Sequence, residues 1–186
     1  MQLKELKKKV LRLIEEYDSN SELLTADPDI SAKINDVINQ VIFELARIKK
    51  IPKYFELEVK QGDLVTFSDF EKECGSEIFQ ISVVSGVKNI PKANNTVFKI
   101  EESGVLEVDC YVYPERITDK TKDNYEFELS LDALEIAPYG IAADLLKSDV
   151  SSEYGTIYAT RYESLKQMLD PRYSTDIITF TGGINI

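Results

Sequence analysis

The sequence predicts an α+β protein in which helical pairs from both ends of the chain form an antiparallel bundle. An antiparallel β-sandwich-like domain is inserted between the pairs, and an extended C-terminal tail follows. Two changes in the spacing of apolar residues support this prediction. Apolar residues recur at helical spacing over residues 3–48, occur at every second position in runs between residues 55 and 113, and return to helical spacing after Ser130. Because a lone helical pair cannot bury its apolar stripe, we expect the two pairs to pack on each other.

The first helical pair is predicted from caps and stops as well as from spacing. Its first helix carries apolar residues every three or four positions from Leu3 to Tyr17. The second begins at Asp27-Pro28, a side-chain cap followed by a proline whose missing N–H costs nothing in a first turn. It is expected to stop at Ile51-Pro52, after two lysines that suit a carboxyl end. Residues 1–52 are therefore assigned to the bundle.

The inserted domain, residues 53–131, is predicted from short β-rich runs separated by turn residues. The runs are residues 55–59, LVTF, EIFQISVV, NTVFKIE, GVLEVDCYVY and, as a closing strand, FELSL at 127–131. EESG at 101–104 is interpreted as a hairpin turn that joins the two runs beside it. Alternation in GVLEVDCYVY turns Tyr111 and Tyr113 away from the core, which makes both candidates for surface contacts.

The second helical pair, residues 132–171, follows the insertion. Ala142 and Ala143 permit a close helix approach, and Pro138 suits a first helical turn. The final helix is expected to bury one stripe, made of Tyr154, Ile157, Tyr158, Tyr162, Leu165, Met168 and Leu169. Asp170-Pro171 ends this helix, and the tail RYSTDIITFTGGINI, residues 172–186, is β-prone after a polar start.

Charge and composition exclude some classes of function. The chain has 186 residues, 33 of them acidic and 22 basic, and a net charge of −11 at pH 7. An acidic chain lacks the clustered cations that attract nucleic acid, and the basic run KELKKK is interleaved with apolar residues, as on the solvated side of a helix. The absence of histidine removes imidazole catalysis and the commonest metal ligand.

No motif of an enzyme, cofactor site or metal site is found in the sequence. Cys74 and Cys110 stand far apart and form no CxxC pair; a disulfide between them stays open, and a reduced cytosolic chain is the simpler interpretation. No Walker loop, GxSxG elbow or dinucleotide fingerprint occurs. We therefore expect no catalytic residues, no metal and no cofactor. Without a signal-peptide pattern or a run of about 20 apolar residues, we also expect synthesis in the cytosol and no membrane contact.

Two side chains stand out of pattern. Arg161 falls within the apolar stripe of the last helix, where its stem can lie along the stripe with its head in water, or its guanidinium can pair with a carboxylate across the bundle or a subunit boundary. Phe43 lies nearly opposite the apolar side of its helix, where it covers the base of the strand region or meets a neighbouring subunit. Both are candidate interface residues.

Three segments resemble the head–tail connector (adaptor) proteins of tailed bacteriophages and prophages. They are INDVINQVIFELARIKKIPKYFE, the strand ending in VDCYVYPERIT, and LEIAPYGIAADLLKSDVSSEYGTIYATRYESLKQMLD. The resemblance runs from about Asp27 to Asp170, and it rests on loose motifs: a helix ending in Ile-Pro, a strand ending in Tyr-Pro-Glu, and an Ala-Ala-Asp-Leu-Leu helix beside a tyrosine-rich one. The long strand-rich insertion is a departure, and the resemblance does not fix its role.

The resemblance implies a structural, non-enzymatic protein of the virion neck, made in the host bacterial cytoplasm. Such adaptors form a homo-oligomeric ring on the portal protein, extend the DNA channel without binding DNA specifically, and present a surface to the next neck or tail protein. The tail would reach towards the portal, which makes Tyr173, Ile177, Ile178 and Phe180 interface candidates. A β-prone tail can add to a sheet edge of a neighbour, although terminal residues are also often disordered.

Two other functions compete with this one. A binding module of a phage tail or neck would use tyrosines of the strand domain, such as Tyr111 and Tyr113, to recognise a carbohydrate or a host surface. A cell-wall hydrolase would need a working carboxylate pair, but neighbouring acidic residues arise by chance in so acidic a chain.

Overall fold

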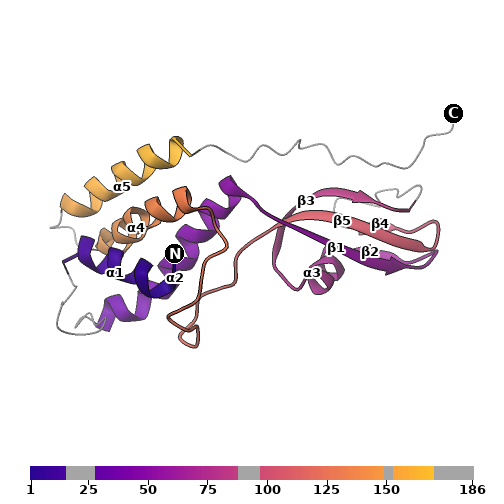
Figure 1. Ribbon diagram of the computed structural model, residues 1–186, viewed down its shortest axis with the longest axis horizontal. Helices are drawn as coiled ribbons and strands as arrows, with labels where there is room; N and C mark the ends of the chain where they lie inside the picture. The colour runs from indigo at the N-terminus through magenta and orange to yellow at the C-terminus, as the bar shows by residue number, and fades with distance from the viewer. Residues whose placement is uncertain (16–27, 88–96, 149–152, 170–186) are drawn as a thin grey trace. The chain divides into compact units, whose positions relative to one another are not determined.

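The computed structural model describes residues 1–15, 28–87, 97–148 and 153–169. Helices and antiparallel sheets occur together, which confirms the α+β class (Figure 1). The chain divides into two compact units, each described by itself below. The helical unit comprises Met1–Lys49 and Pro114–Pro171, and the strand unit takes in the chain from Lys50 to Tyr113. The segment 114–131, assigned from sequence to the insertion, thus lies in the helical unit.

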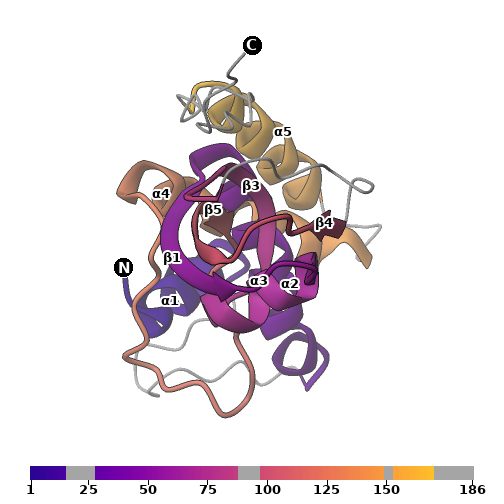
Figure 2. The same ribbon diagram turned by 90° about the vertical axis from the view of Figure 1, so that its right-hand side faces the viewer.

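Helix α4 (Leu131–Leu145) is the centre of the helical unit. It contacts α1 (Leu3–Leu13), α2 (Pro28–Lys49) and α5 (Glu153–Gln167). Figure 1 shows α4 among these helices, and Figure 2 shows the same ribbon turned by 90°. Its small side chains permit this threefold contact, because Ala133, Ala137 and Ala142 are fully buried. Pro138 is also buried, but it lies inside α4 and not in a first turn as predicted. Helix α4 begins seven residues before Pro138, at Leu131. Pro138 cannot donate a backbone hydrogen bond, and the burial of the helical turns on either side of it offsets this loss.

The segment 114–131 is irregular but firmly attached to the helical unit. The side chain of Asn39 on α2 brackets Ile117: its amide donates to the Ile117 carbonyl at 2.8 Å, and its carbonyl accepts from the Ile117 N–H at 2.7 Å. Further along, the carbonyls of Tyr125 and Asp123 accept from the N–H groups of Leu3 and Lys4 at 2.9 and 3.0 Å. These carbonyls satisfy first-turn donors of α1 that no intrahelical partner can reach.

The predicted closing strand at 127–131 is therefore wrong. The N–H of Phe127 donates to the Met1 carbonyl at 3.4 Å, and neighbouring Glu126 makes an isolated bridge to Gln2. Phe127 and Leu129 are buried, so the apolar alternation is real. It fills the helical unit instead of extending a sheet.

The described residues of the strand unit form two antiparallel sheets and one helix. One sheet has the order β1 (Ile51–Val59), β5 (Gly104–Val112), β3 (Ile78–Ser85), and the other pairs β2 (Leu64–Thr66) with β4 (Val97–Lys99). EESG is not the turn of a two-stranded hairpin, because β4 pairs with β2 whereas β5 pairs with β1 and β3. On β5, Leu106, Val108, Cys110 and Val112 are buried, as the alternation predicts.

Helix α3 (Phe67–Cys74) was not predicted. It begins with a capping box in which the Thr66 hydroxyl accepts from the Asp69 N–H and the Asp69 carboxylate accepts from the Thr66 N–H. Phe70 from α3 is fully buried, with its ring centroid 6.0 Å from that of Phe55 and 5.5 Å from that of Phe98. The helix therefore supplies the aromatic centre of this core.

Candidate interaction surfaces

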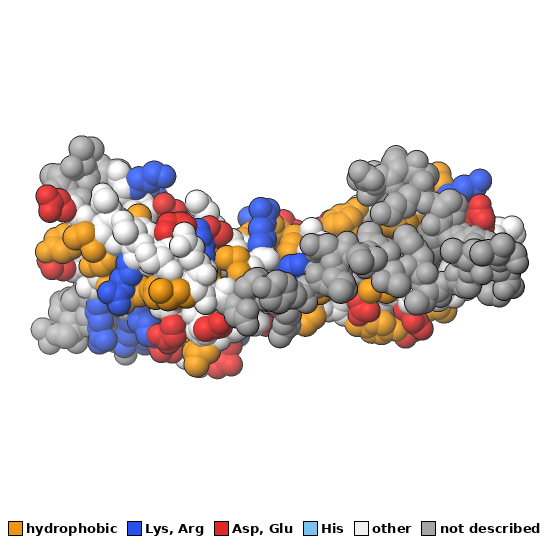
Figure 3. Space-filling view, turned by 90° about the horizontal axis from the view of Figure 1, so that it is seen from above, with side chains coloured by type: hydrophobic (Ala, Val, Ile, Leu, Met, Phe, Trp, Pro, Cys, Tyr) orange, Lys and Arg blue, Asp and Glu red, His pale blue; other side chains and the backbone are white. Residues whose placement is uncertain are grey.

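Helix α5 buries only part of the apolar stripe that its spacing predicts. Tyr162 and Leu169 are buried, whereas Tyr154, Ile157 and Met168 are 56%, 54% and 78% exposed. Tyr154 and Ile157 fall on a row with alternating three- and four-residue spacing, whose side chains share one side of the helix, and Met168 follows in the turn after the helix ends. We call this row the α5 outer row; it consists of Tyr154, Ile157, Arg161, Ser164 and Met168. Figure 3 views the helical unit from the side on which α5 lies, with hydrophobic side chains exposed among polar ones.

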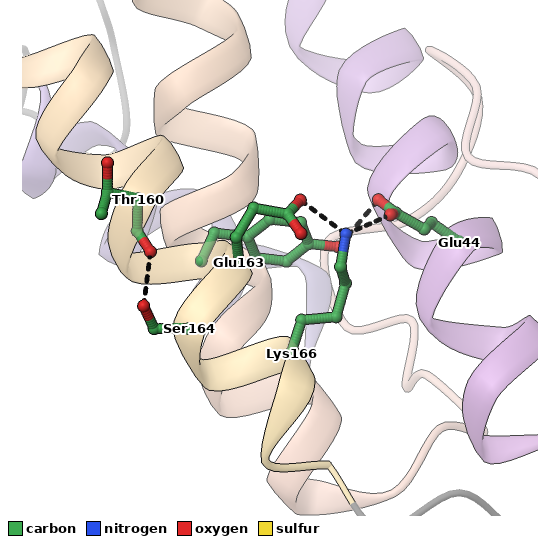
Figure 4. A network of polar contacts seen from close by, with 6 residues as sticks. Glu44, Thr160, Glu163, Ser164 and Lys166 are labelled. Carbon is green, nitrogen blue, oxygen red and sulfur yellow. Dashed lines mark hydrogen bonds and ion pairs between the residues drawn. The ribbon is translucent and has the colours of Figure 1, made fainter.

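The buried side of α5 is held by a polar network (Figure 4). The Tyr162 hydroxyl donates to Glu44 Oε2 at 2.9 Å, and Lys166 Nζ lies 2.6 Å from both Glu44 Oε1 and Glu163 Oε1. Burial and the Glu44 carboxylate raise the pKa of the Tyr162 phenol. Burial alone would lower the pKa of Lys166, but its hydrogen bonds to Glu163 and Glu44 outweigh that effect and raise it. This network fixes α5 against α2.

The amino-terminal half of α5 is held through Tyr158. Its hydroxyl donates to the Leu13 carbonyl at the end of α1 at 2.8 Å, and its ring centroid lies 6.3 Å from those of Tyr139 and Tyr154. The Arg161 guanidinium carbon lies 4.8 Å from the Tyr139 ring centroid. Arg161 is thus exposed, in agreement with the interpretation that puts its head in water, and it also stacks on an aromatic ring that neither interpretation named.

Phe43 is half-buried on α2 and contacts the 114–131 segment. The Arg116 guanidinium carbon lies 4.8 Å from its ring centroid. This contact explains an apolar side chain on the outer side of α2. A role for Phe43 in a subunit contact stays a prediction.

Tyr111 and Tyr113 have different surroundings. The expectation that Tyr113 is available for surface contacts is wrong, because this residue is 8% exposed and its ring centroid lies 5.0 Å from that of Phe79. Its N–H donates to the Glu77 carbonyl at 2.9 Å. Strand β5 ends at Val112, so the alternation no longer applies at the next residue. Tyr111 is half-buried and lies on the outer side of the sheet.

An open pocket of about 420 Å³ lies on this sheet around Tyr111. We call it the sheet pocket; the residues that line it are Pro52, Lys53, Tyr54, Ser82, Asp109, Cys110 and Tyr111. Of these residues, only Tyr111 was predicted from the sequence as an interface candidate. The alternating polar residues of β1 can be recognised in the sequence. They identify a site only when the register between β1 and β5 is known, because this register places Tyr54 opposite Asp109.

The remaining candidates, Tyr173, Ile177, Ile178 and Phe180, lie outside the described residues.

Across the described ranges, no cluster of three or more acidic or cysteine side chains is arranged to hold a metal ion. No helix of that part of the chain combines the length and apolar character needed to cross a membrane. Cys74 and Cys110 are both buried in the strand-unit core. Burial and the neighbouring Cys74 raise the pKa of Cys110 to about 12.

A scan against protein-family models gives no match, and a search of curated proteins gives no significant match.

Proposed function

We propose that this chain is a head–tail connector of a tailed bacteriophage or prophage, which assembles as a ring on the portal and links capsid to tail. The observation that carries the proposal is the α5 outer row. Tyr154 and Ile157 stand more than half exposed on α5, as does Met168 in the turn that follows, and a partly buried polar network holds this helix in place. A fixed helix that keeps an exposed apolar row is typical of a protein that buries this row against another subunit.

The proposal includes the finer architecture. Helices α1, α2, α4 and α5 form the antiparallel bundle that makes the ring contacts, and the strand unit is the inserted, sandwich-like domain. The contacts of α4 with the other three helices support the first part, and the two antiparallel sheets support the second. A net charge of −11 suits a channel through which DNA slides without sticking.

The test is electron microscopy of portal rings mixed with the purified chain. We expect stoichiometric decoration of the portal by a ring of this protein. Ile157→Asp places a charge within the α5 outer row and should abolish the ring. Thr156→Asp adds the same charge at the adjacent exposed position outside the row and should leave the ring intact. Undecorated portals with the unaltered chain, or equal rings with both variants, would refute this use of α5.

The tail, residues 172–186, is proposed to reach towards the portal through Tyr173, Ile177, Ile178 and Phe180. Its deletion should weaken decoration while leaving urea unfolding of the remaining chain unchanged. A large loss of stability on deletion would place the tail in the folded core instead.

The second candidate is a binding module for a carbohydrate or a host surface. It is favoured by Tyr54 and Tyr111, two aromatic side chains that line an open pocket. Glycan-array binding by the chain, lost on Tyr54→Ala, would support this candidate.

A further inference from the structure

The sheet pocket combines aromatic side chains with a carboxylate. The register of β1 and β5 places Tyr54 directly opposite Asp109 and Pro52 directly opposite Tyr111. These four side chains form one tile on the outer side of the sheet, since directly opposed residues of an antiparallel pair are near neighbours. Tyr54 is 53% exposed, and Asp109 and Pro52 are exposed as well.

The electrostatic surroundings of the tile are negative. Glu56 and Glu58 on β1 and Glu107 on β5 continue the same side of the sheet, and Glu56 stands directly opposite Glu107. Like charges in directly opposed positions destabilise a sheet, so folding alone does not account for them. The Tyr54 hydroxyl donates to Glu56 Oε1 at 2.8 Å, which turns its oxygen towards the carboxylates and leaves the ring beside Asp109.

The nearby cations leave Asp109 unneutralised. Lys53 Nζ donates to Ser76 Oγ at 2.7 Å, and Lys50 Nζ lies 5.1 Å from the Tyr111 ring centroid. Within the described part of the chain, the Asp109 carboxylate receives no hydrogen bond or ion pair. Lys50 thus already occupies the cation position on the Tyr111 ring.

We propose that the sheet pocket is a docking site for a basic segment of a partner protein, which inserts an arginine side chain between Tyr54 and Asp109. The guanidinium stacks on the Tyr54 ring and forms an ion pair with Asp109, while Glu56, Glu58 and Glu107 attract neighbouring basic residues of the same segment. Nucleic acid does not fit this surface, because its phosphates would be repelled by these carboxylates. The proposal goes beyond the connector role and holds or fails independently of ring assembly.

The test measures binding of short synthetic peptides to the full chain by fluorescence anisotropy at physiological ionic strength. One peptide carries an arginine pair in a glycine–serine background, and its matched control carries citrulline, which has the same shape without the charge. We expect the arginine peptide to bind and the citrulline peptide to bind at least about tenfold more weakly. Tyr54→Ala and Asp109→Asn should each weaken arginine-peptide binding by a similar factor.

Glu73→Gln is the control for net charge, because this exposed carboxylate lies on α3 and not in the sheet pocket. It should leave the affinity unchanged, and thermal melts should show all three variants folded. If Glu73→Gln and Asp109→Asn weaken arginine-peptide binding equally, the binding comes from general charge attraction, and the proposal is overturned. Absence of arginine-peptide binding, including the case in which glycans bind instead, would also overturn it.

Discussion

A β-carbon added to Gly140 of α4 would lie 2.9 Å from Cε2 of Tyr162 on α5, closer than carbon atoms pack. The bare backbone at Gly140 therefore makes room for Tyr162, the one buried tyrosine of α5. With Tyr162 seated there, its hydroxyl reaches Glu44 on α2. One glycine thus allows three helices to meet.

Gly140→Ala should destabilise the helical unit. The ring or the helix must shift, and this overpacking outweighs the better helix propensity of alanine for a net loss of about 1 kcal/mol or more. Urea unfolding followed by far-UV circular dichroism measures the change. Gly155→Ala is the matched control, because its nearest neighbour would lie 3.4 Å away; it should stabilise by up to about 1 kcal/mol. Equal stability of the two variants would contradict the packing role of Gly140.

Tyr162→Phe removes the hydrogen bond to Glu44 and should cost about 0.5–1.5 kcal/mol of unfolding free energy at neutral pH. The variant should also change the alkaline limb of stability. The pKa of Tyr162 is raised in the folded chain above its ordinary value of 10.0, so the folded state keeps a proton that the unfolded state loses. This contribution is complete below pH 10 and declines as the pH rises further.

The measurement is the unfolding free energy of both proteins from pH 8 to pH 11. We expect the loss above about pH 10 to be less steep in Tyr162→Phe. A residual slope should remain, because the pKa of Lys166 is also raised and this residue is retained. Parallel curves would show that Tyr162 ionises as freely in the folded chain as in the unfolded one.

Periodicity predicted which segments are helices and strands better than it predicted what they pack against. The α5 stripe was correct in spacing, but a spacing cannot show whether neighbours cover the whole stripe; Ile157 and Met168 remain exposed. Phe127 and Leu129 alternate like a strand, yet their partners lie in α1, a long-range pairing that local sequence does not encode. By contrast, α3 was detectable from its Thr66–Asp69 capping box.

Asn39→Ala should loosen the 114–131 segment. The variant loses both hydrogen bonds to Ile117, which is 3% exposed, so the backbone groups of Ile117 stay unpaired or the segment opens. The expected cost is about 1–3 kcal/mol. Hydrogen exchange of the Ile117 amide should accelerate.

Asn35→Ala is the control one turn earlier on the same helix. Its amide donates only to the exposed Asp119, and its buried carbonyl oxygen has no hydrogen-bond partner. Removing it should change stability by about 0.5 kcal/mol or less and leave Ile117 exchange unaltered. If both variants accelerate exchange equally, the two hydrogen bonds between Asn39 and Ile117 are not what holds the 114–131 segment.

Gly86→Ala should be the more damaging of two glycine substitutions in the strand unit. Gly86 and Gly62 have similar positive φ angles of +94° and +92°, so alanine strains the backbone at both by about 1–2 kcal/mol. A β-carbon at Gly86 would also lie 2.2 Å from the Val105 carbonyl oxygen of the central strand β5, whereas nothing lies within 4 Å at Gly62. The Val105 backbone cannot yield without breaking the sheet.

Thiol labelling reports this difference directly. Cys74 and Cys110 are buried in the strand-unit core, and burial with the neighbouring Cys74 raises the pKa of Cys110 to about 12, so a thiol reagent reacts only when the core opens. We expect an additional loss of about 2 kcal/mol in Gly86→Ala over Gly62→Ala, and a labelling rate higher by roughly the corresponding factor of 30. Equal labelling of the two variants would mean that β3 and β5 separate at Gly86 without opening the core, and the close approach to Val105 would then be a local feature of the sheet end.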